Sequence, residues 1–372
     1  MKKIIFVTNT AGFSKFNAPF MQWLKEQGWR VDNAAPGIEI GEVDHQYNLP
    51  IERSPFSMKN IESYQKLKKI LDENKYDIIH CHTAVGALLA RLAAIKTKKL
   101  NRTKILYTAH GFHFFKGSPI SYWFTFFLIE LLLAPLTNVL VTINEEDFQL
   151  GKKYKMGKKI FKIDGVGVNL DKFVPLSREK RIQLRHELFD YKEEDFIILY
   201  TAQFIKRKNH KFLINSIPNL IKKIPNLKIV FAGNGETFDE CKQLSKELNV
   251  EKYIQFLGGR KDINHLCGIS DLHVSTSLQE GLATNNIEAM ACGLPIVVSD
   301  IRGQRDVCKN NENGFLFDLK KPEEMEDSIL RLYQDKNLYD RISNFNKVDV
   351  QKYSVKREME IMGKIYIETL ES

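Results

Sequence analysis

Cysteine is scarce in this chain of 372 residues, and its spacing lacks the patterns of a structural role. The count is odd, and no CxxC or cysteine–histidine metal spacing occurs. These absences argue against a disulfide framework and a zinc site, and they favour a reducing cytoplasm. We therefore expect no metal ion and no bound cofactor. The five cysteines are Cys81, Cys241, Cys267, Cys292 and Cys308.

Long apolar runs are also rare, and the one that needs attention is Pro119–Ile143, whose only formal charge is Glu130. Its length could span a bilayer. Glu130 lies in the middle of the run, however, Pro135 and Asn138 interrupt it, and its last five residues resemble a strand. We expect a buried helix followed by a strand. A helix in the membrane interface is the second interpretation, and a membrane span is the third.

Acidic residues are fewer than basic ones, which leaves a formal net charge of +9. A basic chain favours anionic partners, such as nucleic acid, phosphorylated small molecules or an anionic membrane. No recognisable nucleic-acid-binding motif occurs, so nucleic acid is disfavoured. The basic stretches Lys96–Lys104 and Lys152–Lys159 could contact an anionic membrane or a lipid-pyrophosphate acceptor. Alternatively, they only add solubility. We expect a cytoplasmic protein that could lie peripherally at the inner face of the membrane.

The first half of the chain alternates short apolar strands with amphipathic helices. Lys3–Val7 predicts a strand, which a loop with Ala11 and Gly12 follows, and then a helix over Ala18–Gln27 that Gly28 ends. Such alternation implies a parallel sheet covered on both faces. The other strands expected here are Asp77–Cys81, Lys104–Tyr107 and Val139–Ile143, with helices at Ile61–Asn74 and Gly86–Ile95.

A second series of the same kind begins after residue 170. Its first strand is Phe196–Tyr200, and its last pattern, Val355–Leu370, is an amphipathic helix with no strand after it. Two series predict two α/β domains, each with its ligand site at the carboxyl ends of the strands. The later strands expected are Lys228–Ala232, Tyr253–Leu257, Leu272–Ser275 and Ile296–Ser299.

The stretch Glu280–Pro295 (EGLATNNIEAMACGLP) predicts a turn and a short helix with Thr284 or Asn285 as its N-cap. The free N–H groups at such a helix start form an anion site that could hold a diphosphate. Glu280 precedes the helix and Glu288 lies inside it. Carboxylates accept hydrogen bonds from sugar hydroxyls, but both could equally be ordinary acidic residues that the helix dipole favours.

Glu280 and Glu288, with seven residues between them, resemble the paired-glutamate motif of retaining glycosyltransferases of family 4. Other segments resemble this family in the same order along almost the whole chain. The likeness is closest to bacterial enzymes of exopolysaccharide and capsule synthesis. These segments are KKIIFVTNTAGF, YDIIHCHTAVGALLARLAA, ILYTAHGFHFFKG, VLVTINEEDF, GVGVNLDKF and, as a late loop, ENGFLF.

The resemblance implies the GT-B fold, in which two Rossmann-like parallel-sheet domains face a cleft. Residues 1–170 would form an acceptor-binding domain, and residues 171–352 a domain that binds the nucleotide sugar. Residues 353–372 would form a C-terminal helix that crosses back to the first domain.

The resemblance also implies roles for individual residues around the helix start. Glu288 would bind the ribose hydroxyls of the donor, and Glu280 would bind hydroxyls of the transferred sugar. Backbone N–H groups of Leu282, Ala283 and Thr284 would meet the diphosphate.

A cationic loop, Thr201–His210 (TAQFIKRKNH), follows the first strand of the second series. Without a metal, lysine or arginine must neutralise a departing nucleotide diphosphate. The family usually has an arginine and, five residues later, a lysine; Lys208 matches the lysine, but Gln203 stands at the arginine position. We expect Arg207 or Lys206 to compensate. The other interpretation is a solvated charged loop.

Three further positions follow from the resemblance. His110 would lie beside the donor sugar and stabilise positive charge at the anomeric carbon, and it fits the motif spacing better than His113. Gly12 would let the backbone approach the diphosphate, unless it is a plain turn glycine. Arg260 would lie near the nucleotide base. His82 has no third metal ligand at a suitable spacing, so we place it in the acceptor cleft.

The resemblance thus implies transfer of a sugar from a nucleotide sugar to a saccharide acceptor in cell-surface polysaccharide biosynthesis. We expect the donor to be a UDP-sugar and the acceptor to be lipid-linked. Two alternatives stay open. One is a nucleotide-sugar 2-epimerase, which uses two such domains but needs no acceptor. The other is a non-catalytic subunit that binds sugar nucleotides, which Gln203 in place of arginine keeps in view.

Overall fold

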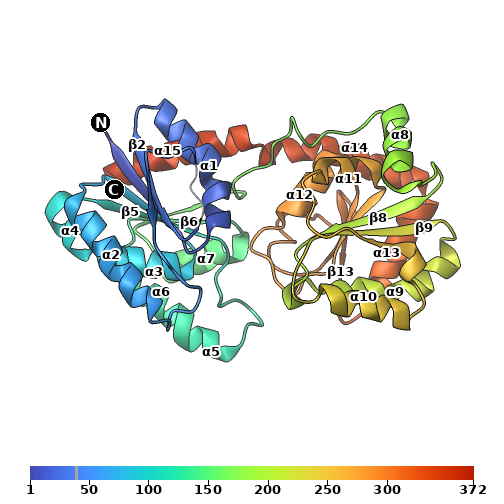
Figure 1. The fold of residues 1–372 in the computed structure, drawn as a ribbon, viewed down its shortest axis with the longest axis horizontal. Helices are drawn as coiled ribbons and strands as arrows, with labels where there is room; N and C mark the ends of the chain where they lie inside the picture. The colour runs from blue at the N-terminus through green and yellow to red at the C-terminus, as the bar shows by residue number, and fades with distance from the viewer. Residues whose placement is uncertain (38–40) are drawn as a thin grey trace. The chain divides into compact units, whose positions relative to one another are not determined.

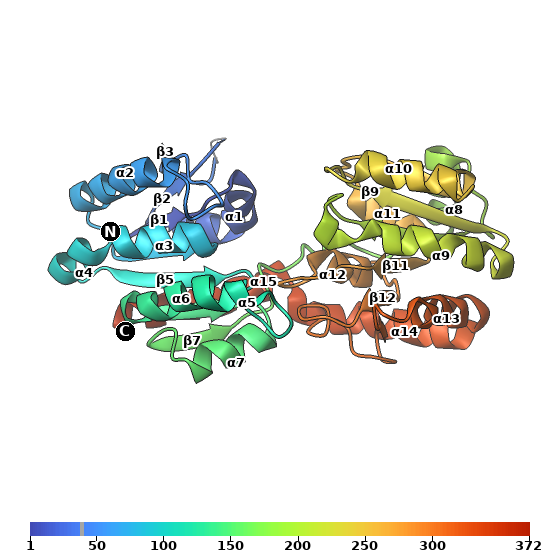
Figure 2. The same ribbon diagram turned by 90° about the horizontal axis from the view of Figure 1, so that it is seen from below.

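The computed structural model describes residues 1–37 and 41–372. It divides into two compact units (Figures 1 and 2). The first unit contains Met1–Val166 together with Val355–Ser372, and the second contains Gly167–Ser354. The last helix of the chain therefore belongs to the first unit. No helix among the described residues is long and apolar enough to cross a membrane.

The first unit is built on a seven-stranded sheet with the order β3-β2-β1-β4-β5-β6-β7, in which every pair is parallel. The chain first adds strands on one side of β1 and then returns to add β4 on its other side. In such sheets a ligand site forms where the order reverses, at the carboxyl ends of β1 and β4. The strands are β1 Lys3–Val7, β2 Arg30–Ala35, β3 His45–Asn48, β4 Ile78–His82, β5 Lys104–Ala109, β6 Val139–Thr142 and β7 Lys159–Lys162.

Helices cover both faces of this sheet, and α2 lies beside α3 (Figure 2). The expected loop around Gly12 is wrong, because α1 already begins at Ala11. The Thr10 hydroxyl accepts a hydrogen bond from the N–H of Phe13 at 3.4 Å and caps the helix. The helices are α1 Ala11–Glu26, α2 Lys59–Glu73, α3 Ala84–Ala93, α4 Ile95–Asn101, α7 Glu145–Lys153 and α15 Val355–Glu371.

Helix α15 packs against α1 and β5, as expected for a C-terminal helix that returns to the first domain (Figure 1). Tyr366 stacks on Trp23 with ring centroids 6.5 Å apart, and its hydroxyl lies 3.0 Å from Nδ1 of His80 in β4. A Cβ atom at Gly363 would lie 2.8 Å from the Trp23 ring, so this contact depends on glycine. The helix is therefore an integral part of the first unit.

The apolar segment before β6 differs from the expectation of a buried helix. It forms α5 Ile120–Tyr122, a π-helical turn over Trp123–Phe127, α6 Leu128–Leu133 and a 3₁₀ turn over Ala134–Leu136. One side of it packs on the core through Trp123, Phe126 and Phe127, and the opposite side is exposed. A helix on the surface of a sheet can bury only one face. The strand expected after it is confirmed as β6.

The second unit has a six-stranded parallel sheet with the order β10-β9-β8-β11-β12-β13. Here the order reverses between β8 and β11. Successive residues of β8 alternate between two apolar cores, as the period of a strand requires: Ile198 lies in one core, and Ile197 and Leu199 lie in the other. The strands are β8 Phe196–Thr201, β9 Leu227–Ala232, β10 Ile254–Phe256, β11 Leu272–Ser275, β12 Ile296–Ser299 and β13 Gly314–Phe317.

Two layers of helices enclose this sheet. Side chains of α9, α10 and α13 fill one core, and those of α8, α11 and α12 fill the other. Three short 3₁₀ turns occur at Lys206–Lys208, Glu251–Tyr253 and Val350–Tyr353. The helices are α8 Arg178–Phe189, α9 His210–Lys223, α10 Phe238–Glu247, α11 Ile263–Ile269, α12 Thr284–Ala291, α13 Pro322–Gln334 and α14 Lys336–Asp349.

Four strands do not appear in the sequence prediction. Strands β3, β7 and β13 are short edge strands, and β2 carries Asp32 and Asn33 within its run. The ENGFLF segment, expected to be a loop, contributes β13. Edge strands need little apolar surface, so their sequences carry a weak signal.

Candidate functional site

The cationic loop and the glutamate turn meet at the reversal point of the second sheet. Lys208 lies in the loop after β8, and Glu280 lies in the loop after β11. Because β8 and β11 are neighbours, their carboxyl ends bring the two loops together. The topology thus explains why residues separated by 72 positions come into contact.

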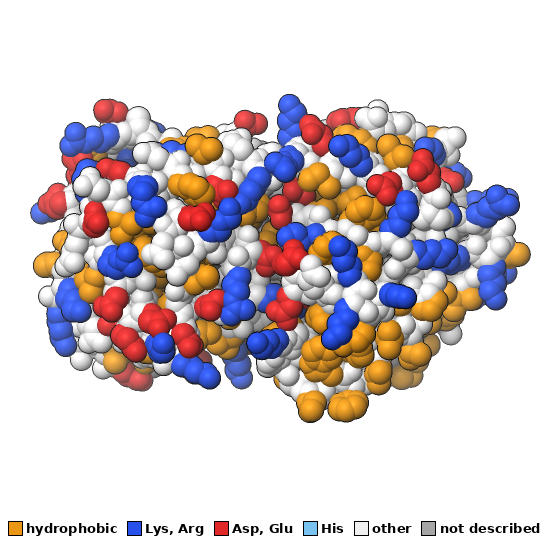
Figure 3. All heavy atoms as spheres, turned by 180° about the vertical axis from the view of Figure 1, so that it is seen from behind, with side chains coloured by type: hydrophobic (Ala, Val, Ile, Leu, Met, Phe, Trp, Pro, Cys, Tyr) orange, Lys and Arg blue, Asp and Glu red, His pale blue; other side chains and the backbone are white. Residues whose placement is uncertain are grey.

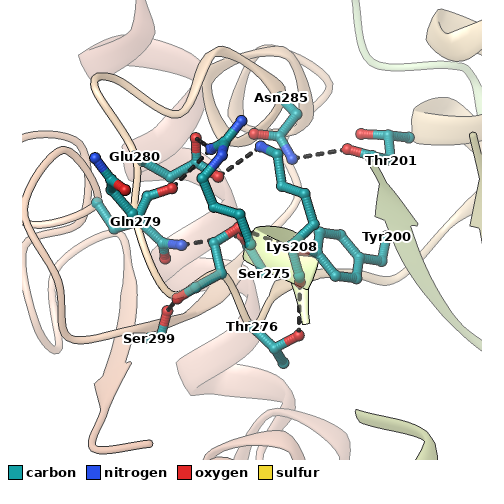
Figure 4. A network of polar contacts seen from close by, with 12 residues as sticks. Tyr200, Thr201, Lys208, Ser275, Thr276, Gln279, Glu280, Asn285 and Ser299 are labelled. Carbon is teal, nitrogen blue, oxygen red and sulfur yellow. Dashed lines mark hydrogen bonds and ion pairs between the residues drawn. The ribbon is translucent and has the colours of Figure 1, made fainter. Parts of the chain in front are cut away.

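Glu280 is the centre of a compact ion cluster (Figure 4). Its carboxylate accepts a hydrogen bond from Nζ of Lys208 at 2.5 Å and another from Nη1 of Arg207 at 3.0 Å. The same Arg207 nitrogen donates to the carbonyl of Gln279 at 2.7 Å. Glu280 is only 6% exposed, so these two cations replace the water that would otherwise solvate its carboxylate. The cluster places two positive charges and one acid at the carboxyl ends of the central strands β8 and β11.

Backbone contacts hold the cationic loop in place. The Tyr200 hydroxyl donates to the carbonyl of Lys208 at 2.6 Å, and the Thr276 hydroxyl donates to the carbonyl of Asn209 at 2.8 Å. The N–H of Leu278 donates to the carbonyl of Arg207 at 2.8 Å. Asn209 adopts φ 52°, a left-handed conformation in which asparagine is among the better-tolerated residues. These contacts fix the positions from which both cations extend.

Sequence reasoning missed the polar residues that support this loop. Tyr200, Ser275 and Ser277 are buried in or next to the strands, and the Tyr200 hydroxyl also lies 3.1 Å from Oγ of Ser277. Gln304 donates to Oγ of Ser275 at 3.0 Å. Hydroxyl side chains in a run that otherwise reads as a buried strand were the signal that could have identified them.

The start of α12 is open, because neither Thr284 nor Asn285 caps it. The N-cap position is Ala283, which has no side-chain hydrogen bond, and Asn285 instead donates to the carbonyl of Thr201 at 2.8 Å. Within the described residues, the backbone N–H groups of Leu282 and Ala283 donate no hydrogen bond, whereas that of Thr284, the third expected donor, already donates to the carbonyl of Leu282 at 3.1 Å. Unpaired donors at a helix start favour an anion.

Glu288 lies in the second turn of α12 and is half-buried. Burial raises the pKa of its carboxyl to about 7, against the opposing charge of Lys172. Among the residues that the structure describes, its carboxylate has no hydrogen-bond partner. It is therefore available to a ligand at the side of α12.

The structure distinguishes the two residues expected to compensate for Gln203. Arg207 reaches Glu280, whereas the Lys206 side chain is exposed and makes no ion pair within the described part of the chain. Gln203 itself is exposed at the end of β8. Arg207 is thus the second cation of the cluster.

Arg260 makes no contact with the ion cluster around Glu280 among the hydrogen bonds and ion pairs of the described residues. It is exposed after β10, and its guanidinium makes two hydrogen bonds to Asp262, at 2.8 and 2.5 Å. Neighbouring Gly258 and Gly259 lie against the side chain of Asn234, where a Cβ atom on either would be 2.9 Å from an amide atom. A role for Arg260 at a nucleotide base stays a prediction.

His110 belongs to a buried cluster in the first unit, at the carboxyl ends of β4 and β5. Its Nε2 atom lies 3.0 Å from Nδ1 of His82, and its ring lies 4.5 Å from the ring of Phe13. Burial lowers the pKa of His110 to about 4, so the ring is neutral at pH 7. A neutral ring or a backbone carbonyl can then act only as a dipole.

Gly12 lies in the first turn of α1 and is exposed, with no atom closer than 3.9 Å to the position of a Cβ. The surface of α1 next to Gly12 is therefore not filled by other side chains. The role of Gly12 toward a diphosphate stays a prediction. In the described ranges 1–37 and 41–372, no group of three His, Cys, Asp or Glu side chains is placed to hold a metal ion.

Two parallel Rossmann-like sheets are the architecture of the GT-B fold. A cationic loop and an open helix start at the reversal point of the second sheet are typical of the nucleotide-sugar glycosyltransferases that have this fold. The family matches agree. Residues 3–143 match the family described as glycosyl transferase 4-like, and residues 185–349 match glycosyl transferases group 1.

The chain belongs to this glycosyltransferase family. It is 39% identical to the putative glycosyltransferase EpsD of Bacillus subtilis (strain 168), and the match covers 98% of this chain and 96% of the relative. It is 28% identical, over 84% of this chain and 80% of the relative, to an Escherichia coli enzyme named UDP-Gal:alpha-D-GlcNAc-diphosphoundecaprenol alpha-1,3-galactosyltransferase.

A solved structure confirms the fold. The HepE protein of Anabaena, crystallised in complex with UDP and glucose, superposes with a TM-score of 0.82 at 17% identity, and covers 99% of this chain and 100% of its own.

Proposed function

We propose that this protein is a retaining, metal-independent glycosyltransferase that transfers a sugar from a UDP-sugar to a lipid-linked saccharide in cell-surface polysaccharide biosynthesis. The relatives support this proposal. The Escherichia coli relative is named for a UDP-sugar donor and a lipid diphosphate acceptor, and HepE was crystallised with UDP. We place the reaction at the cytoplasmic face of the membrane, with the nucleotide sugar on the second unit and the acceptor on the first.

The observation that carries the proposal is the buried carboxylate of Glu280, held by Lys208 and Arg207 beside the open start of α12. In the free protein the acid balances the two cations. A diphosphate arriving at the helix start would share those cations, because it carries more negative charge than one carboxylate. Glu280 would then be free to accept hydrogen bonds from the hydroxyls of the transferred sugar.

The same arrangement accounts for departure of the nucleotide. As the anomeric bond breaks, negative charge grows on the diphosphate, and Lys208 together with the N–H groups of Leu282 and Ala283 stabilises it. No side chain is assigned as a covalent nucleophile. The leaving phosphate would accept the proton of the acceptor hydroxyl, so that the new bond forms on the face from which the nucleotide leaves. Glu288 would hold the ribose.

The test is sugar transfer in the presence of EDTA, with Glu280→Gln as the variant. We expect turnover to fall by about 10²- to 10³-fold, because a neutral amide cannot balance Lys208 or orient the sugar as a carboxylate does. UDP binding should be retained. Glu247→Gln, which alters an exposed acid on α10, serves as the control and should retain activity. Unchanged turnover in Glu280→Gln would contradict the proposal.

The two alternatives give different products. A 2-epimerase would convert UDP-N-acetylglucosamine alone into its 2-epimer, without any acceptor. A non-catalytic subunit would bind UDP but give no transfer with any acceptor, and Glu280→Gln would then leave polysaccharide assembly in cells unchanged.

A further inference from the structure

The segment from α5 to α6 presents an apolar stripe to solvent. Phe124 and Leu132 are 70% and 78% exposed, although both are large apolar side chains. Exposed positions recur at intervals of three and four along the segment, which places them on one helical face. The stripe consists of Ile120, Phe124, Leu128, Leu131, Leu132 and Pro135. Figure 3 shows apolar side chains gathered over this part of the first unit.

The one acid of the segment points away from the stripe. Glu130 is buried, and its carboxylate lies 2.8 Å from Nη1 of Arg91 and accepts a hydrogen bond from the Tyr107 hydroxyl at 3.2 Å. The Arg91 guanidinium also lies over the Tyr107 ring, 4.6 Å from its centroid. Glu130, which in the sequence argued against a membrane span, is thus paired with a cation inside the unit. The outward face of the segment carries no formal charge.

Lysines border the stripe on one side. An open pocket of about 730 Å³ joins Leu131 and Pro135 of the stripe to Lys152, Lys155 and Lys158. All three lysines are exposed, and none makes an ion pair with an acid in the described part of the chain. Their positive charge is therefore not balanced locally, unlike that of Lys159, which pairs with Glu368 at 3.0 Å.

Lys98, a fourth lysine, lies close enough to Lys158 to be affected by its positive charge. The Lys98 ammonium donates a hydrogen bond to the carbonyl of Leu136, at the end of the apolar segment. Burial lowers the pKa of Lys98 to about 8, and the neighbouring charges of Lys158 and Lys104 act in the same direction. A surface with this excess of positive charge would gain from nearby anions.

We propose that the apolar stripe and the lysines of the adjoining pocket form a docking surface for an anionic phospholipid bilayer. Phe124 and Leu132 enter the boundary between head groups and acyl chains, while Lys152, Lys155 and Lys158 lie at the phosphates. A second copy of the chain is a poorer occupant, because a two-fold contact through this face would bring the lysine clusters together. The inference deepens the lipid-linked part of the proposed function, but it does not depend on the transfer chemistry.

The expected effects follow from the size of each contribution. Each lysine near an anionic surface contributes about a fivefold change in partition, so Lys152→Gln with Lys155→Gln should weaken binding about 25-fold. Removing two inserted apolar side chains in Phe124→Ser with Leu132→Ser should weaken it by at least about tenfold. The lysine contribution should decline with added salt, and the apolar one should not.

The test is co-sedimentation of the full chain with vesicles of phosphatidylcholine alone or with phosphatidylglycerol added. We expect binding to the anionic vesicles, and much weaker binding to the neutral ones. Phe56→Ser on the first unit and Val348→Ser on the second change exposed apolar side chains that are not part of the stripe, and Lys69→Gln changes an exposed lysine on α2 that does not line the pocket. These three controls should bind as the wild type does.

Two further readouts separate the outcomes. Equal binding to both vesicle types, or wild-type binding by both double variants, would overturn the proposal. So would a self-association that Phe124→Ser with Leu132→Ser abolishes while vesicle binding is retained. UDP binding, measured without vesicles, reports folding of each variant and tests the second unit separately, so failure of docking and failure of the proposed function can be told apart.

Discussion

At the scale of single residues, we propose that Arg207 takes the place of the arginine that the family has at position 203. The family places an arginine there, whereas this chain has Gln203 exposed at the end of β8 and Arg207 paired with Glu280 at 3.0 Å. Arg207 would then supply the charge that the family takes from the other position.

A rescue experiment can test whether Arg207 takes over the role of an arginine at position 203. Arg207→Ala should weaken UDP-sugar binding by about tenfold, as loss of one charge-assisted contact to phosphate implies. Adding Gln203→Arg to that variant should restore most of the loss. Calorimetric titration with a UDP-sugar measures both effects. If Gln203→Arg gives no recovery while Arg207→Ala binds weakly, the two positions are not equivalent.

The sequence predicted part of this residue pattern. It identified the acids and the cations separately, through the resemblance, and it placed them at the ends of two strands. It could not show that Lys208 pairs with Glu280 in the free protein, because that contact depends on β8 and β11 being neighbours. The Tyr200 hydroxyl was visible within a buried strand, but its contact with the carbonyl of Lys208 depends on the path of the loop after β8.

At the scale of elements, α12 shows how one short helix gathers several functions. Its uncapped start follows the turn that carries Glu280, and Glu288 lies one turn further along. Burial in this position, rather than a neighbouring acid, raises the pKa of Glu288 to about 7. The carboxyl therefore changes its charge within the physiological range of pH.

Donor binding should consequently depend on pH. If the ionised carboxylate accepts the ribose hydroxyls, affinity must rise as pH increases through about 7, since the proton competes with the ligand. Affinity for a UDP-sugar should increase by up to about tenfold from pH 6 to pH 8. A UDP-sugar is preferable to UDP, whose terminal phosphate itself titrates near pH 6.

Glu288→Gln provides the matched control, because its side chain cannot titrate. Its affinity for the same UDP-sugar should be nearly constant over this range of pH. A wild-type affinity that falls between pH 6 and pH 8, or a slope that Glu288→Gln retains, would show that another group is responsible.

The helices and strands differed in how clearly the sequence predicted them. Central strands such as β1, β8 and β12 are buried on both faces, so their continuous apolar runs were sufficient. The edge strands β3 and β13 were missed because an edge strand pairs with a neighbour on one side only and needs fewer apolar residues. Helix α1 begins earlier than expected, because the Thr10 cap outweighs the helix-breaking tendency of Gly12.

At the scale of the whole molecule, the chain crosses from the first unit to the second and returns only through α15. The return is secured by specific contacts of Tyr366 and Gly363 within the first unit. The sequence indicated two α/β series and a terminal helix, and family resemblance supplied the GT-B arrangement. Where the surface meets other molecules was harder to predict: the apolar segment before β6 was expected in the core, yet one face of it is exposed.

The central claim is that a lysine and main-chain N–H groups, without a metal ion, hold the nucleotide diphosphate in the second unit. Titration calorimetry of UDP in EDTA, with wild-type protein and Lys208→Ala, tests it most directly. We predict that the wild type binds UDP and that Lys208→Ala binds at least about tenfold more weakly. Equal affinity of the two proteins, or wild-type binding that requires a divalent cation, would contradict the account.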